Sequence, residues 1–382
     1  MPRYVQRGST KLRHDRRLSN RGVAATLCVS AGTGQISVMI AVVTGSTGFI
    51  GSHLVDALLA RGDTVRALVR PETRRAVRDD RIENFEADLL DDRSVRESRA
   101  WEGATHVFHL AGVTRGRTLA HFRAGNVFPT ANLLAALAAR PGRRPRVVLV
   151  SSQAAAGPAA SADAPIRETD RPVPVEAYGR SKLQAEQAVV RYRDELPITI
   201  IRPAAVYGPR DRDFLAAFKQ ASGRVALHAV PRAHSFSVVH VTDLVDALIR
   251  AAEQPEAAGR TYFVASDTLT WGQLYDEVSA AAGSRPIQVQ VPRSAVRVAA
   301  HAGDLLSTLT GRSTLLSRNK AALARQRWWL CDASPARADL GWNPRIPLQL
   351  GLRETYNWYV DAGWLRPPKP DPTERPLEEP QA

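Results

Sequence analysis

The sequence predicts an α/β protein, a doubly wound parallel sheet with helices on both faces, followed by a smaller mixed lobe. Three observations support this class. Short apolar segments alternate with amphipathic helical segments through the first half of the chain. A glycine-rich turn joins the first apolar segment to the first helix, and the alternation becomes irregular after Tyr207-Gly208-Pro209. Strands that alternate with helices imply a parallel sheet covered on both faces.

Each strand of the predicted sheet is a short apolar run, the pattern of a strand buried on both faces. The helices between them carry apolar residues at helical spacing, and glycine or proline marks where they stop, as at Gly62 and Pro141. The strands are predicted at Met39–Val43, Thr64–Val69, Ile82–Ala87, His106–Leu110, Arg146–Val150 and Ile198–Ile201. The helices are predicted at Phe49–Ala60, Phe122–Arg140 and Ala177–Arg193.

Beyond residue 209 the alternation is lost, which predicts a smaller lobe over residues 210–365 with segments that return to the first domain. Its strands are predicted at Ser235–His240, Thr261–Ala265 and Ile287–Val291, and its helices at Phe214–Phe218 and Val296–Leu309. His240 and Asp243 are interpreted as structural residues that pack and cap the junction of the lobe.

The two ends of the chain differ in composition from the rest. Residues 1–38 are rich in arginine and poor in acids, and they predict a disordered extension. Two alternatives remain for this segment: an upstream start that leaves Met39 as the natural first residue, and an organelle transit peptide. Residues 366–382 are rich in proline and charge and predict a disordered tail.

The composition narrows the class of partner. The chain has 382 residues, 44% hydrophobic and 24% charged, which is ordinary for a globular protein. Cys28 and Cys331 lie far apart and match neither a disulfide framework nor a metal site, so a reducing cytoplasm is the expected location. The net charge of +14 comes from scattered arginines without a basic run interleaved with aromatics. No apolar run approaches the roughly 20 residues that span a bilayer. We expect a small-molecule substrate and neither nucleic acid nor membrane as partner.

The glycine-rich turn is the first functional signal. In the Rossmann-type βαβ unit, Gly45 permits a tight turn, Gly48 lets the backbone approach a pyrophosphate, and Gly51 allows close packing of helix on sheet. The helix that follows offers free N–H groups and a partial positive charge to phosphates. The turn therefore predicts a nicotinamide dinucleotide site. Its residues are Thr44, Gly45, Ser46, Thr47, Gly48, Phe49, Ile50 and Gly51.

Residues after the second and third strands bear on the adenosine end of that cofactor. A carboxylate after the second strand would bind the ribose 2′-hydroxyl of NAD, but this chain has Arg70 there. A guanidinium suits a phosphate, so NADP is favoured, with NAD possible. The alternative is that Arg70 is a solvated surface charge. Asp88, followed by Leu89, is interpreted either as an acceptor for the adenine amine or as a helix N-cap.

A tyrosine and a lysine four residues apart supply the catalytic hypothesis. Tyr178 and Lys182 share one face of a predicted helix. A neighbouring ammonium favours the phenolate and is expected to bring the pKa of the tyrosine closer to neutral. Such a tyrosine exchanges the hydroxyl proton while hydride moves to or from the nicotinamide. Ser151 and Ser152 end the fifth strand, where their hydroxyls would hold the substrate oxygen.

Together these motifs resemble the extended short-chain dehydrogenase/reductase family, also called the NAD-dependent epimerase/dehydratase family, over about Met39 to Leu365. The resemblance implies that residues 39–209 form the NAD(P)-binding and catalytic domain. It implies Tyr178 as general acid/base and Lys182 as the residue that lowers its pKa and binds the nicotinamide ribose. It also implies a homodimer through helices that include the Tyr178 helix. The residues that carry it are Thr44–Gly51, Asp88-Leu89, His109-Leu110-Ala111-Gly112, Asn126-Val127, Ser151-Ser152, Tyr178–Lys182, Arg202-Pro203, Val206–Pro209 and Val239–Leu244.

The same resemblance assigns Leu110, Ala111 and Gly112 to the cofactor wall, Asn126 to the cofactor site, and Pro203 to the nicotinamide end. One departure matters. Many sugar-nucleotide epimerases of the family carry a serine or threonine where this chain has Gln153, so either Ser152 or the Gln153 amide is expected to orient the substrate.

The serine pair followed by a variable residue is more similar to 3β-hydroxysteroid dehydrogenase relatives, and the second strand resembles dihydroflavonol reductases. We therefore expect an NAD(P)-dependent oxidoreductase that acts on a secondary alcohol or ketone. The alternatives are an NAD-retaining sugar-nucleotide epimerase and a cofactor-binding scaffold without turnover. Arg210, Arg212 and Arg232 could grip a diphosphate, but solvated surface residues are the simpler interpretation.

Overall fold

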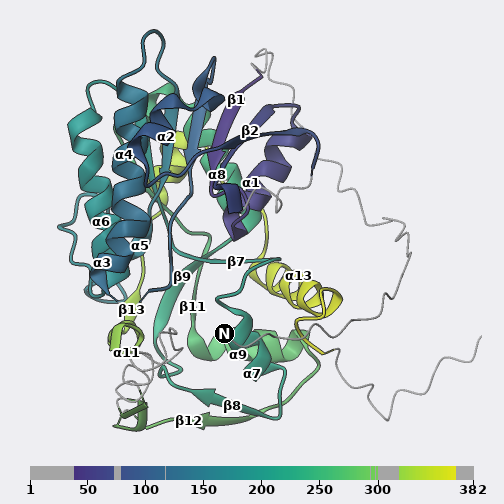
Figure 1. Ribbon diagram of the computed structural model, residues 1–382. Helices are drawn as coiled ribbons and strands as arrows, with labels where there is room; N and C mark the ends of the chain where they lie inside the picture. The colour runs from purple at the N-terminus through teal and green to yellow at the C-terminus, as the bar shows by residue number, and fades with distance from the viewer. Residues whose placement is uncertain are drawn as a thin grey trace, which may run out of the picture. The chain divides into compact units, whose positions relative to one another are not determined.

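The computed structural model describes residues 38–72, 79–116, 118–292, 294–296, 298–299 and 318–366. The compact unit begins at Val38. Its centre is a parallel sheet in the order β10-β6-β5-β4-β1-β2-β3 (Figure 1). The chain winds outward in both directions from the β1/β4 boundary, the doubly wound arrangement that the sequence predicts. The strands are β1 (Ile40–Thr44), β2 (Thr64–Val69), β3 (Ile82–Glu86), β4 (His106–His109), β5 (Arg146–Val150), β6 (Ile198–Pro203) and β10 (Thr261–Val264).

Helices cover both faces of this sheet, and each face has its own apolar core. Leucines of α1 and α8 pack with Val43, Phe108 and Ile201 on one face. Leucines of α4 and Val95 of α2 pack with Val107 on the other. The first layer consists of α1 (Phe49–Ala60), α8 (Val241–Glu253) and α12 (Ser334–Leu340). The second layer consists of α2 (Asp92–Glu97), α4 (Phe128–Ala138) and α6 (Ala177–Val189).

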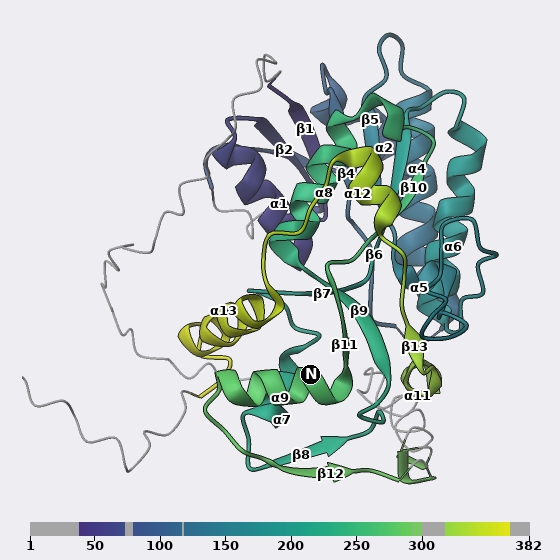
Figure 2. The same cartoon turned by 180° about the vertical axis from the view of Figure 1, so that it is seen from behind.

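A smaller lobe lies beyond the carboxyl ends of the strands, as Figure 2 shows from behind. Its core is aromatic and includes Phe218, Phe236, Tyr356 and Tyr359. Its strands are β7 (Ala205–Tyr207), β8 (Val225–His228), β9 (Ser235–His240), β11 (Asp267–Thr270), β12 (Ile287–Gln290) and β13 (Trp328–Trp329). Its helices are α7 (Leu215–Ala221), α9 (Trp271–Ala281), α11 (Arg318–Arg325) and α13 (Leu348–Asp361). The chain also forms the short helices α3 (Leu119–Phe122), η3 (Arg123–Val127) and α5 (Gln153–Ala156).

The strand and helix predictions of the first half are confirmed, with small changes at the ends. The largest difference lies in the helix predicted over Phe122–Arg140, which is α3, a π-helical turn over η3, and α4. The strand predicted at Thr261–Ala265 belongs to the main sheet, where β10 pairs with β6, and not to the lobe. Most of the helix predicted at Val296–Leu309 lies outside the described residues.

The returning segments are fixed to the main sheet by Asp243 in the first turn of α8. Its carboxylate accepts hydrogen bonds from the backbone N–H groups of Arg345 (2.8 Å) and Ile346 (3.1 Å). Its carbonyl oxygen accepts one from the indole of Trp342 (2.9 Å), which is fully buried. The structural role predicted for Asp243 is therefore to hold the chain between α12 and α13. His240 caps the same helix, accepting from the N–H of Thr242.

Asp243→Ala is expected to lower the free energy of unfolding by about 2–3 kcal/mol, because two backbone donors lose a charged acceptor. Asp246→Ala on the same helix is the matched control. It removes a half-exposed ion pair with Arg250 and is expected to cost less than about 1 kcal/mol. Urea unfolding of the two variants measures the difference, and equal losses would contradict the anchoring role of Asp243.

Candidate active site

The glycine-rich turn follows β1 and begins α1, as predicted. Gly45 has a φ of +71°, a conformation that glycine adopts without strain. A Cβ on Gly45 would lie 2.7 Å from the backbone nitrogen of Ala111, and one on Gly51 would lie 2.1 Å from the carbonyl oxygen of Gly45. Gly45 and Gly51 are therefore required by the close approach of the turn to the β4 loop and of α1 to the turn.

Gly48 has a different environment, which suits a ligand. A Cβ there would meet only the carbonyl oxygen of Gly45, at 3.1 Å, so its other side is open. The hydroxyl of Ser46 is buried without a partner, and the N–H groups of Phe49 and Ile50 donate to no described residue. Unpaired donors at the start of a 12-residue helix fit the pyrophosphate of a dinucleotide. Thr47 beside them is exposed.

The far wall of this site is the segment after β4, which a chain of buried hydrogen bonds positions. Thr44 Oγ1 lies 2.8 Å from His109 Nδ1, and His109 Nε2 lies 3.0 Å from Thr130 Oγ1. The N–H of Ala111 donates to Thr44 Oγ1 (3.1 Å), which fixes Leu110 and Ala111 beside the glycine turn. Burial lowers the pKa of His109 to about 3, and the charge of Lys182 adds to this, so the imidazole is neutral.

Asn126 lies in the π-helical turn and is buried. Its side chain accepts from the N–H of Val113 (2.7 Å) and donates to the carbonyl of Val113 (3.1 Å) and to Ser181 Oγ (2.9 Å). A Cβ on Gly112 would lie 2.8 Å from Asn126 Oδ1. Asn126 therefore links the segment after β4 to Ser181 of α6, and its assignment to the cofactor site stays a prediction.

The residues predicted for the adenosine end follow β2 and β3, at the same end of the parallel sheet as the glycine-rich turn. Arg70 directly follows β2 and is exposed. Asp88 accepts from the N–H of Leu90 (2.9 Å) within its own turn, while Asp91 caps α2, so the interpretation of Asp88 as the helix N-cap is wrong. The carbonyl of Leu89 accepts from the Asn132 side chain (2.9 Å), which links this turn to α4.

Tyr178, in the first turn of α6, meets Ser152 at the end of β5. The Tyr178 ring packs edge-on against Phe122 with centroids 5.9 Å apart. Burial raises the pKa of Tyr178 to about 12, and the Ser152 hydroxyl is close enough to oppose that rise. The expected lowering of this pKa by a neighbouring ammonium is therefore wrong for the protein groups alone, because burial outweighs every other influence on the phenol.

Lys182 lies one helical turn beyond Tyr178, which is half-buried, and is itself buried. Its ammonium donates to the carbonyl of Val150 (2.7 Å), and burial lowers its pKa to about 8, opposed by the charge of Glu186. The carbonyl of Val150 thus holds Lys182 at the strand end that leads into Ser151 and Ser152.

The two serines have different partners. Ser151 is buried, and its hydroxyl donates to Glu186, which also receives two hydrogen bonds from Arg202, at 3.0 and 2.7 Å. This buried network ties β5, α6 and β6 together. The Glu186–Arg202 pair was not predicted from the sequence. An arginine inside the apolar run before Pro203 does indicate that a buried acid lies nearby. Pro203 itself ends β6 opposite Val264 of β10.

Gln153, the residue that departs from the epimerase pattern, begins α5 directly after Ser152. It is 5% exposed, and its amide nitrogen has no hydrogen-bond partner in the described part of the chain. A buried amide donor without a partner is costly unless something outside the polypeptide satisfies it.

Comparison with known proteins shows the family to which the chain belongs. The sequence model of the NAD dependent epimerase/dehydratase family matches residues 41–265. The chain is 30% identical to the ceramide reductase of Caulobacter vibrioides, over 85% of this chain and 96% of that one. It is 27% identical to a UDP-glucose 4-epimerase of Vibrio cholerae (84% and 95%) and 29% identical to a 4-hydroxy-2-methyl-3-oxo-4-farnesyl-3,4-dihydroquinoline-1-oxide ketoreductase of Stigmatella aurantiaca (81% and 93%).

Solved structures share the fold. The UDP-glucose 4-epimerase of Thermus thermophilus in complex with NAD superposes with a TM-score of 0.66 at 24% identity, covering 84% of this chain and 99% of that one. That of Thermotoga maritima with UDP-glucose has a TM-score of 0.68 at 22% identity (84% and 99%). The chain belongs to the NAD-dependent epimerase/dehydratase family. It is an NAD(P)-binding enzyme of the oxidoreductase/epimerase type. The family match confirms the resemblance predicted from the sequence, and the solved structures confirm the fold class.

Gly51→Ala is expected to weaken NADH binding by about tenfold or more, because its Cβ displaces the backbone of the turn that meets the pyrophosphate. Ser52→Ala is the control in the same helix, since its hydroxyl bonds only the carbonyl of Phe49 (3.0 Å). Fluorescence titration with NADH compares the two variants. Unchanged affinity in Gly51→Ala would show that the turn does not hold the cofactor.

Proposed function

We propose that the enzyme is a reductase that transfers hydride from a nicotinamide cofactor to a ketone, with Tyr178 as general acid. The observation that carries the proposal is the approach of two hydroxyls, that of Tyr178 at the start of α6 and that of Ser152 directly after β5, which is close enough to lower the pKa of the phenol. Ser152 and Tyr178 together provide two hydroxyl donors for one substrate oxygen. Ser151 is assigned a structural role because Glu186 holds its hydroxyl.

The protonation states suit reduction. Because burial holds the pKa of Tyr178 at about 12, the phenol keeps its proton at neutral pH and can give it to the oxygen of a carbonyl that accepts hydride. Lys182, with a pKa of about 8, is mostly an ammonium at neutral pH, and in this proposal it would bind the cofactor ribose. The reduced nicotinamide, when bound, supplies the hydride.

We propose an apolar substrate. Asp213 is close enough to Tyr178 to affect the pKa of its phenol, so the segment that begins the lobe borders the site. The next residue, Phe214, stacks on Phe236 (centroids 6.3 Å apart), and Phe236 packs on Trp271 (4.8 Å). Two of the relatives are named for reactions of a ceramide and of a farnesyl-bearing quinoline oxide.

The three arginines considered for binding a diphosphate have partners within the protein. Arg210 pairs with Asp56 (2.8 Å) and Arg232 with Asp276 (2.8 Å). The guanidinium of Arg212 lies over the Trp364 ring, 5.0 Å from its centroid. This supports a reductase of an apolar ketone over the alternative, a sugar-nucleotide epimerase. An epimerase would retain its cofactor through purification and dialysis, whereas a reductase would exchange it.

We propose that Gln153 orients the substrate. Its buried amide nitrogen follows directly after Ser152 and lacks a partner, so a substrate acceptor group would satisfy it. An acceptor beside the reacting carbonyl, such as a neighbouring hydroxyl or amide oxygen, fits this donor.

We also propose NADP as the preferred cofactor, with Arg70 binding the 2′-phosphate. Arg70 is exposed at the end of β2, where the adenosine ribose lies in proteins with this turn.

We also propose a homodimer that forms through α4 and α6. Phe128 of α4 is 53% exposed, and a helix of the partner subunit would cover this apolar side chain.

Tyr178→Phe is expected to lower kcat for NADPH-dependent ketone reduction by about 10²–10⁴-fold while NADPH affinity stays within about twofold, because only the proton donor is lost. The measurement is NADPH oxidation with a panel of steroid, long-chain and flavonoid ketones. Tyr192→Phe, a conservative change after the end of α6, is the control. Full activity in Tyr178→Phe would exclude the proposed acid, and a wild type active only on sugar nucleotides would favour epimerisation.

Arg70→Gln is expected to weaken NADPH binding by about 10- to 100-fold and leave NADH binding unchanged, because it removes a charge-assisted contact to the 2′-phosphate, which NADH lacks. Arg93→Gln, which removes a guanidinium from the exposed surface of α2, is the matched control. If the wild-type enzyme binds NADH more tightly than NADPH, the assignment of Arg70 is wrong.

A further inference from the structure

The β8–β12 pair of the lobe carries an exposed apolar face. The strands are parallel, with Val225 opposite Ile287 and Leu227 opposite Val289. Since alternate residues of a strand point to the same side, these side chains share one face. They are 46%, 69%, 51% and 42% exposed, respectively. Exposed aliphatic side chains that stand together on one small sheet mark an interaction site more often than scattered ones do.

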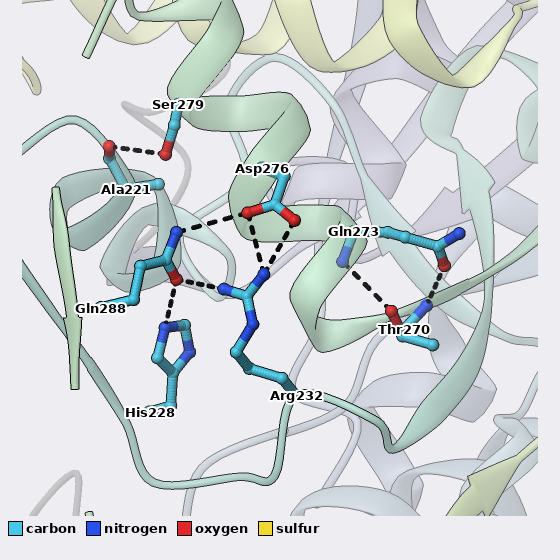
Figure 3. A network of polar contacts seen from close by, with 8 residues as sticks. All are labelled: Ala221, His228, Arg232, Thr270, Gln273, Asp276, Ser279 and Gln288. Atoms are coloured by element: carbon cyan, nitrogen blue, oxygen red, sulfur yellow. Dashed lines mark hydrogen bonds and ion pairs between the residues drawn. The ribbon is translucent and has the colours of Figure 1, made fainter. Parts of the chain in front are cut away.

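The opposite face of the pair is fixed to the lobe by a polar network, shown in Figure 3. The side-chain oxygen of Gln288 accepts from His228 Nε2 (2.6 Å) and from Arg232, and its nitrogen donates to Asp276 (3.3 Å). Arg232 also binds Asp276 of α9, at 2.8 and 3.0 Å. Gln288 and His228 therefore point inward, and the register of the pair holds the aliphatic side chains outward.

Basic residues precede both strands of the pair. Arg224 directly precedes Val225 at the start of β8, and Arg285 precedes Ile287, the first residue of β12, by two residues. Both are exposed, and neither forms an ion pair with any residue that the structure describes. Lys219, exposed near the end of α7, adds a third positive charge. The nearby carboxylate of Asp276 is already neutralised by Arg232.

We propose that this face, the side chains of Val225, Leu227, Ile287 and Val289 with Arg224 and Arg285 beside them, docks on an anionic lipid bilayer. Aliphatic side chains that enter the headgroup region and guanidiniums that bind lipid phosphates are the two components of peripheral membrane binding. A second copy is a poorer occupant, because a two-fold contact would bring the unpaired arginines of both copies together.

This proposal departs from the prediction made from the sequence. No membrane partner was expected, because no segment of the sequence could span a bilayer. No helix of the described chain is long and apolar enough to cross a membrane. Docking on the surface needs no spanning segment. It also does not rest on the proposed function, because vesicle binding is measured without cofactor or ketone.

The test is co-sedimentation of the full chain with vesicles of phosphatidylcholine containing about a quarter phosphatidylglycerol, and with pure phosphatidylcholine. The wild-type protein is expected to bind the anionic vesicles. The double variant Arg224→Gln/Arg285→Gln is expected to bind them roughly thirtyfold more weakly. Leu227→Gln/Ile287→Gln is expected to bind about tenfold more weakly even though no charge changes.

Matched controls test whether vesicle binding depends on this face or only on the net positive charge of the protein. Arg93→Gln/Arg99→Gln removes two exposed arginines on and beside α2, and Leu90→Gln/Val173→Gln removes two exposed aliphatic side chains. Both controls are expected to bind like the wild type. NADPH titration and thermal unfolding verify that every variant is folded.

The proposal is overturned if the wild type does not bind anionic vesicles, or if the face variants and the controls lose binding equally. It is also overturned if Leu227→Gln/Ile287→Gln turns a wild-type dimer into a monomer in size-exclusion chromatography, since a second copy would then cover the face. Loss of ketone reduction with intact vesicle binding would count against the proposed function alone.

Discussion

The buried ion pair between Glu186 and Arg202 is the interaction on which the site depends. It joins α6 to β6, and the hydroxyl of Ser151 brings β5 into the same network. Tyr178 and Lys182 lie on α6 and Ser152 follows Ser151, so this network joins the elements that carry the three predicted site residues. Removing one partner of a buried pair leaves an uncompensated charge. The catalytic geometry and the stability of this part of the sheet are therefore coupled.

Burial also shifts the pKa values of Tyr178 and Lys182 in opposite directions. The same lack of solvent raises the pKa of the Tyr178 phenol and lowers that of the Lys182 ammonium. Burial favours the neutral form of each group. At neutral pH the phenol therefore keeps its proton, whereas the ammonium loses its proton more readily than that of a free lysine. A protonated phenol suits the donation of a proton to a substrate more than the removal of one from it.

The sequence predicted the sheet, the glycine turn and the Tyr178–Lys182 helix because each depends on local pattern: apolar runs, glycine spacing and helical period. It did not predict the place of β10, because a four-residue strand carries no sign of the distant strand with which it pairs. It could not separate Ser151 from Ser152, since their roles depend on Glu186, which is 35 residues away. It also misjudged the pKa of Tyr178, because burial is a property of the fold and not of spacing.

The late position of β10 in the chain has a consequence for how the protein is made. β6 obtains its outer neighbour only when residues 261–264 are available, well after the catalytic residues have left the ribosome. Until then the backbone donors and acceptors along the outer side of β6 form an open sheet edge beside an apolar strand. The nascent domain is therefore exposed to strand pairing with other chains for the whole time in which the first part of the lobe is synthesised.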